Sequence, residues 1–90
     1  MTFEWDRKKA AANLKKHGVT FQEAATVFGD TLAITFHDPD HSEEEDRYLT
    51  FGLSLQNRLV VVSHTERGNE TRIISALLMD HKEKVIYEEG

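Results

Sequence analysis

Cysteine is absent from the 90 residues, which excludes disulfide frameworks, thiolate zinc sites and cysteine nucleophiles. Long apolar runs are also absent: the longest aliphatic run covers residues 59–62, whereas a membrane helix needs roughly 20 residues. Residues 1–20 are charged and do not resemble a signal peptide. The chain has one proline and no repeat, so nothing divides it. We therefore expect a single domain over residues 1–90, located in the cytoplasm and without a membrane partner.

Gly-rich phosphate loops and the Gly-x-Ser-x-Gly nucleophile motif are missing as well. Residues 37–46 form a polar, acidic stretch in which His37, Asp38, Asp40 and His41 are possible metal ligands. Their spacing matches no established ligand set, and a flexible loop is a poor frame for a metal's geometry. We expect a solvated acidic hairpin here, with no metal and no cofactor.

Charge is unevenly distributed along the chain. The net charge is −5, but residues 1–20 carry +3 and residues 21–57 carry −7. Because an anionic ligand responds to local potential rather than to net charge, the chain could present a basic face to nucleic acid. Charge that is simply solvated on all faces would account for the same numbers.

The first third of the chain predicts a short strand and two helices. The strand covers residues 3–5, and a helix over residues 7–17 follows and ends at Gly18. Thr20 and Glu23 have the spacing of a capping box, which predicts the start of a second, short helix.

From residue 31 onward, apolar residues alternate with polar ones, a pattern typical of strands. The expected strands cover residues 31–36, 47–53, 59–62 and 71–76, and a last helix covers residues 77–89. The strand at 59–62 is apolar on both faces and is expected at the centre of the sheet. The fold class is therefore α+β: a short N-terminal strand and two helices, a four-stranded antiparallel meander and a C-terminal helix, with the helices against one face of the sheet.

Basic side chains gather at the ends of these predicted elements. The candidates are Lys16, His17, Arg47, His64, Arg67 and Arg72. If residues 66–69 form a hairpin turn, Arg67 and Arg72 lie near one rim of the sheet. Cations that converge on such a rim can bind phosphate and stabilise developing negative charge.

Each candidate also has a structural interpretation. Lys16 and His17 are favoured at the end of a helix by its dipole. Arg47 can pair with a neighbouring carboxylate, and His64 can be a half-buried, hydrogen-bonded residue. The residues alone leave these alternatives open.

Four motifs carry a family resemblance. They are Phe3-Glu4-Trp5-Asp6 with Lys9, Asn13-Leu14-Lys15-Lys16-His17-Gly18-Val19-Thr20-Phe21, His64-Thr65-Glu66-Arg67-Gly68, and Arg72-Ile73-Ile74-Ser75-Ala76. In this order they resemble the BrnT toxin family, over nearly the whole chain. The resemblance implies a RelE-like fold and a ribonuclease toxin of a bacterial type II toxin–antitoxin pair. It also implies a ribbon-helix-helix antitoxin in a two-plus-two complex, with promoter DNA bound only through the antitoxin.

RNA cleavage without a metal ion proceeds by attack of the ribose 2′-hydroxyl on the adjacent phosphorus, and it needs a base, an acid and cations. Our hypothesis gives the phosphate to Arg67 and Arg72, and proton transfer to His64 or His17. Histidine suits that role because its ordinary pKa is about 6.5. The remaining cations are expected to bind the RNA strand: Lys16 and Arg47.

The chain departs from the family pattern after Ala76. The family has an arginine and then a basic helix, whereas this chain has Leu77-Leu78-Met79. An exposed apolar patch of this kind commonly marks a partner surface, unless the side chains pack beneath the last helix. The alternative function is therefore a catalytically weakened toxin homologue that acts mainly as an antitoxin-binding co-repressor subunit.

Overall fold

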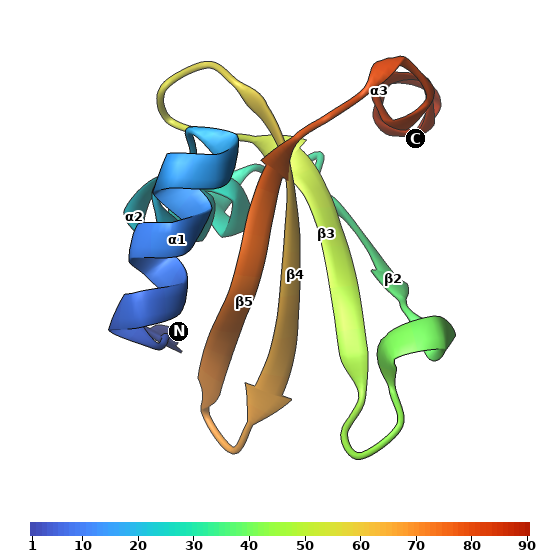
Figure 1. Cartoon of the computed structure of the whole chain (residues 1–90). Helices are drawn as coiled ribbons and strands as arrows, with labels where there is room; N and C mark the ends of the chain where they lie inside the picture. Colours follow the sequence, from blue (N-terminus) through green and yellow to red (C-terminus); the bar gives the residue numbers. More distant parts are fainter.

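Five strands form one mixed sheet in the computed structural model, which describes residues 1–90 (Figure 1). In chain order the elements are β1 (Thr2–Glu4), α1 (Arg7–His17), α2 (Phe21–Thr26), the 3-10 turn η1 (Val27–Gly29), β2 (Ile34–His37), the 3-10 turn η2 (Pro39–His41), β3 (Arg47–Leu53), β4 (Leu59–Arg67), β5 (Glu70–Leu78) and α3 (His81–Glu89). The strand order is β1-β5-β4-β3-β2, so the apolar strand β4 is central, as predicted. Strands β2 to β5 are antiparallel neighbours, and β1 adds a parallel edge beside β5. The α+β class is confirmed, and none of the helices is long and apolar enough to span a membrane.

Helix α1 begins and ends as the sequence predicts. The Asp6 carboxylate accepts a hydrogen bond from the Lys9 amide (3.0 Å), and Gly18 ends the helix in a left-handed conformation (φ 70°). Buried Asn13 ties the helix to the sheet, because its amide donates to the Ala76 carbonyl (2.8 Å) and accepts from the Ala76 amide (3.1 Å). Because β1 pairs with only three residues of β5, it does not reach Ala76. Asn13 supplies the hydrogen-bond partners of the Ala76 backbone instead.

Only half of the capping box predicted before α2 is formed. The Thr20 hydroxyl accepts a hydrogen bond from the Glu23 amide (3.0 Å), but the buried Glu23 carboxylate does not return to Thr20. It accepts hydrogen bonds from Arg58 and from the Ser54 hydroxyl (2.7 Å) instead. The Arg58 guanidinium lowers the pKa of Glu23, so this carboxylate stays ionised and joins α2 to the β3–β4 connection.

Helices cover both faces of the sheet, which corrects the prediction that all of them pack on one face. On one face, α1 and α2 pack over Val60 and Val62. Val61 points the other way and forms a smaller apolar cluster with Phe51 and Met79. Tyr87 of α3 packs against this cluster. In Figure 1, α1 and α2 lie to the left of β5, whereas α3 lies to the right, beyond the upper ends of the strands. Periodicity alone does not choose a face for α3, because its apolar stripe is short.

The last helix begins four residues later than predicted, at His81 rather than at Leu77. Leu77 and Leu78 still pair with β4, so the period of two continues through them. Asp80 then begins α3 with a complete capping box. Tyr87 anchors the helix by donating a hydrogen bond to the Asp30 carboxylate (2.7 Å).

Candidate functional site

Alternation along β4 places three of the predicted arginines on one face of the sheet. The core valines of β4 that pack beneath α1 and α2 have even numbers, so the odd-numbered residues point to the opposite face. Arg47 of β3 and Arg72 of β5 both pair in register with Thr65 of β4 and share its face. Arg67 lies two residues beyond Thr65 on the same strand. The prediction that Arg67 and Arg72 lie near one rim of the sheet is confirmed.

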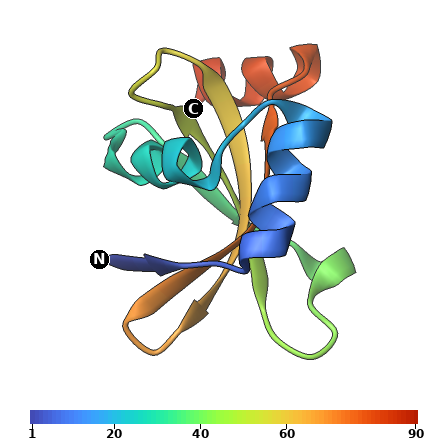
Figure 2. The same ribbon diagram turned by 60° about the vertical axis from the view of Figure 1, so that its left-hand side comes forward.

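One line of paired residues crosses four strands on this face. In spatial order it contains Glu4 of β1, Arg72 of β5, Thr65 of β4 and Arg47 of β3. Because neighbouring strands are about 4.8 Å apart, the line is roughly 14 Å long. We call these four residues together with Arg67 the arginine row. Figure 2 shows β1 toward the β4–β5 turn and α3 at the opposite end of the sheet, so α3 does not cover the arginine row.

Carboxylates hold two of the three guanidinium groups. Arg72 Nη1 lies 3.3 Å from Glu4 Oε1, and Arg67 Nη1 lies 3.9 Å from the same oxygen. Arg67 also donates to both oxygens of Glu45, from Nε (3.3 Å) and from Nη2 (3.2 Å), and these hydrogen bonds raise its pKa. The Arg67 side chain remains 50% exposed, so it is open to an additional ligand.

Arg47 forms no ion pair and borders an acidic hollow. The hollow is lined by Asp40, His41, Glu43, Glu44, Glu45 and Arg47. In the same loop, His41 lies 2.9 Å from Asp38 and His37 lies 3.1 Å from Asp46. No three potential metal ligands of the chain lie close enough together to hold a metal ion.

His64 does not join the arginine row, although the hypothesis of proton transfer by His64 or His17 needs an imidazole close to Arg67 and Arg72. Its side chain lies on the face covered by α1 and α2, with its ring 4.9 Å from that of Phe28, and it is 4% exposed. Both ring nitrogens have partners: Nε2 lies 2.7 Å from the Thr50 hydroxyl and Nδ1 lies 2.8 Å from Glu66. The hydrogen-bonded, structural interpretation of His64 fits this geometry, although the side chain is fully buried rather than half-buried.

His64 is the centre of a polar chain that crosses the sheet. The Thr50 hydroxyl also bonds to that of Thr35 (2.8 Å), and Glu66 accepts a hydrogen bond from the Thr71 hydroxyl (2.8 Å). The chain therefore joins β2, β3, β4 and β5 through side chains alone. The members Thr50, His64 and Thr71 are buried, and no buried side-chain polar atom lacks a partner, whereas Glu66 near the end of β4 is 48% exposed.

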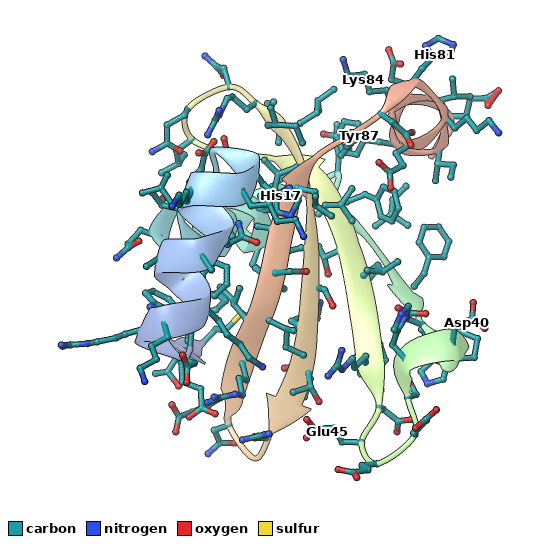
Figure 3. The ribbon with its side chains drawn as sticks, in the orientation of Figure 1. His17, Asp40, Glu45, His81, Lys84 and Tyr87 are labelled. Carbon is teal, nitrogen blue, oxygen red and sulfur yellow. The ribbon has the colours of Figure 1, made fainter.

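Lys16 and His17 lie far from the arginine row, at the C-terminal end of α1. The helix starts three residues after Glu4, and its eleven residues span about 16 Å. Figure 3 shows His17 near the upper end of β5 and Glu45, the partner of Arg67, at the lower end of the sheet. Both Lys16 and His17 line a shallow groove between α1 and Ile74. His17 therefore does not meet the guanidinium groups either.

A family model described as "Ribonuclease toxin, BrnT, of type II toxin-antitoxin system" matches residues 5–83. The chain belongs to the BrnT family. Its fold is also similar to a crystal structure of the Brucella abortus ribonuclease toxin BrnT, with a TM-score of 0.70 and 20% sequence identity. That similarity covers 90% of this chain and 99% of the Brucella chain. No curated protein matches.

Sequence reasoning assigned no role to one member of the arginine row, Glu4. The residue stood in a recognised motif, but its position beside Arg72 depends on parallel pairing between β1 and β5. Strands at opposite ends of a chain give no local signal of their pairing. Alternation around Glu4 and around Arg72 predicts that each side chain points to one face of a sheet, but it does not predict that the two strands are neighbours.

Protonation of His64 is expected to destabilise this BrnT-family fold. Burial lowers the pKa of His64 below 6.5, and hydrogen bonding to Glu66 only partly opposes it. The unfolded chain therefore takes up this proton at a higher pH than the folded chain. It follows that stability is complete above about pH 6.5 and is lost progressively as the pH falls below that value.

The measurement is the free energy of unfolding in urea at several pH values between about 7.5 and 5. We expect it to fall more steeply for the parent than for His64→Gln. Equal slopes for the two proteins would contradict this account of His64.

Proposed function

We propose that this BrnT-family chain is an endoribonuclease whose arginine row binds the scissile phosphodiester of RNA and promotes cleavage without a metal ion. The observation that carries the proposal is the placement of Arg47 and Arg72 on either side of Thr65, with Arg67 beside them. Guanidinium groups bind phosphate oxygens through paired hydrogen bonds. Fixed on a sheet, they are already in place for the negative charge that develops as phosphorus becomes five-coordinate.

The ion pair between Arg67 and Glu45 is compatible with phosphate binding. Both side chains are well exposed, at 50% and 39%. Exposed ion pairs contribute only about 0.2–1 kcal/mol, so a phosphate with two charge-assisted hydrogen bonds can take the place of Glu45. The acidic hollow beside Arg47 would then border the RNA strand and repel any phosphate that is out of register.

We assign the groove along α1 to a more distant part of the RNA strand. Lys16 and His17 lie there without carboxylate partners, and Lys9 lines the same groove. The proton-transfer role first considered for His64 and His17 is not part of this proposal, because neither imidazole lies at the arginine row.

Removing either central arginine tests the proposal. Arg67→Ala and Arg72→Ala should each lower the rate at which the purified chain cleaves naked RNA by about 10²–10³-fold, because each removes a donor to the transition state. Arg7→Ala, which removes an exposed guanidinium from α1, should cleave at the parent's rate. EDTA should leave the parent's rate unchanged. Cleavage at the parent's rate by both Arg67→Ala and Arg72→Ala would refute this site.

We further propose that the antitoxin partner is a ribbon-helix-helix protein in a two-plus-two complex. Membership of the BrnT family implies an antitoxin, and ribbon-helix-helix proteins are dimers. With a net charge of −5, this chain is poorly suited to bind DNA itself, so promoter binding is assigned to the antitoxin. The co-repressor alternative is not favoured, since the family that matches is one of ribonuclease toxins.

Expression in bacteria and the mass of the purified complex test this assembly. We expect the chain alone to arrest growth, the adjacent antitoxin gene to relieve the arrest, and the complex to have the mass of two copies of each protein. Absence of growth arrest, with tight antitoxin binding, would support the co-repressor alternative instead. A complex of one copy each would contradict the proposed stoichiometry.

A further inference from the structure

Glu4 is the one carboxylate that lies between two guanidinium groups of the arginine row. Its Oε1 atom is 3.3 Å from Arg72 and 3.9 Å from Arg67. Register pairing of β1 with β5 fixes the Glu4 backbone directly beside Arg72. The Glu4 side chain is 32% exposed, and its second oxygen has no hydrogen-bond partner.

Stability alone does not account for a carboxylate at this position. Partly exposed ion pairs contribute little to folding, and a negative charge between two arginines weakens the attraction of the row for an anionic ligand. Such a group is useful if it takes part in the reaction. Cleavage through the ribose 2′-hydroxyl requires a base next to the cations that hold the phosphate.

The other proton acceptors near the row are less suitable. His64 and Glu66 lie on the opposite face and bond to each other. His17 lies at the far end of α1. Glu45 contacts Arg67 but not Arg72, and it belongs to the loop between η2 and β3 rather than to a strand.

We infer that Glu4 is the general base of the proposed ribonuclease. This inference rests on the proposed function. With the phosphate on Arg67 and Arg72, the Glu4 carboxylate accepts the proton of the adjacent 2′-hydroxyl. The O2′–P bond forms while the P–O5′ bond breaks, which leaves a 2′,3′-cyclic phosphate on one fragment. The departing O5′ takes a proton from solvent and becomes a hydroxyl, and Glu4 later returns its proton to solvent.

Glu4→Gln is the direct test, because it keeps the shape of the side chain and removes its basicity. We expect kcat on naked RNA to fall about 10²–10³-fold, while KM stays equal or falls because one negative charge is gone. Glu4→Asp keeps a carboxylate and should retain an intermediate rate. The expected products of the parent are 2′,3′-cyclic phosphate and 5′-hydroxyl ends, and a substrate with a 2′-deoxyribose at the cleaved position should not react.

Two matched controls separate a chemical role from an effect of charge or folding. Glu70→Gln removes the same charge two residues before Arg72, where no ion pair is formed. Glu45→Gln removes the other carboxylate partner of Arg67. Glu70→Gln should cleave within about threefold of the parent's rate, and its melting temperature should be close to that of Glu4→Gln. Glu45→Gln should cleave at least as fast as the parent, because it removes only a competitor of the phosphate for Arg67.

The outcomes distinguish this inference from the proposed function. Cleavage by Glu4→Gln at the parent's rate, together with loss of cleavage in Arg72→Ala, would overturn the role of Glu4 and leave the arginine site intact. Loss of cleavage in Glu45→Gln but not in Glu4→Gln would assign the base to Glu45 instead. Absence of cleavage by the parent would overturn both the function and the inference.

Discussion

Burial of Val60 and Val62 beneath α1 and α2 decides which face of the sheet each side chain of β4 occupies. A register slip of one residue would send Arg67 under α1 and α2 and bring His64 to the face that carries the arginine row. Burying each such aliphatic side chain stabilises the fold by about 1.5–3 kcal/mol, whereas an exposed ion pair contributes at most about 1 kcal/mol. The core therefore places the guanidinium groups, and the exposed ion pair between Arg67 and Glu45 contributes little to the fold.

The two faces of the sheet use polar residues in opposite ways. Beneath the helices, the chain from Thr35 through His64 to Thr71 is closed, because each side chain is bonded to the next. On the other face, Arg47 has no carboxylate partner and Arg67 is half exposed. A closed network holds strands together, whereas open charged groups are available to a ligand. This difference is why we assign structure to His64 and RNA binding to the arginine row.

Local sequence signals predicted local structure well. The bounds of β3, the start and end of α1 and the central place of β4 follow from alternation, capping residues and apolar content. The errors concern residues that are distant in sequence. Glu23 pairs with Arg58 instead of completing its capping box, and α3 packs on the other face of the sheet. Glu4 lies beside Arg72 because β1 pairs in parallel with β5. Tertiary contacts decided each of these, and no local pattern encodes them.

The most direct test of the arginine row is to observe its side chains while RNA is bound. The measurement is the set of arginine Nε–H signals in NMR spectra of the 15N-labelled chain, titrated with a 2′-O-methylated RNA that cannot be cleaved. The account predicts saturable shifts of the signals of Arg47, Arg67 and Arg72, whereas that of Arg58 stays in place. If RNA shifts only signals of residues in α1 or α2 and leaves those of Arg47, Arg67 and Arg72 unchanged, the account is contradicted.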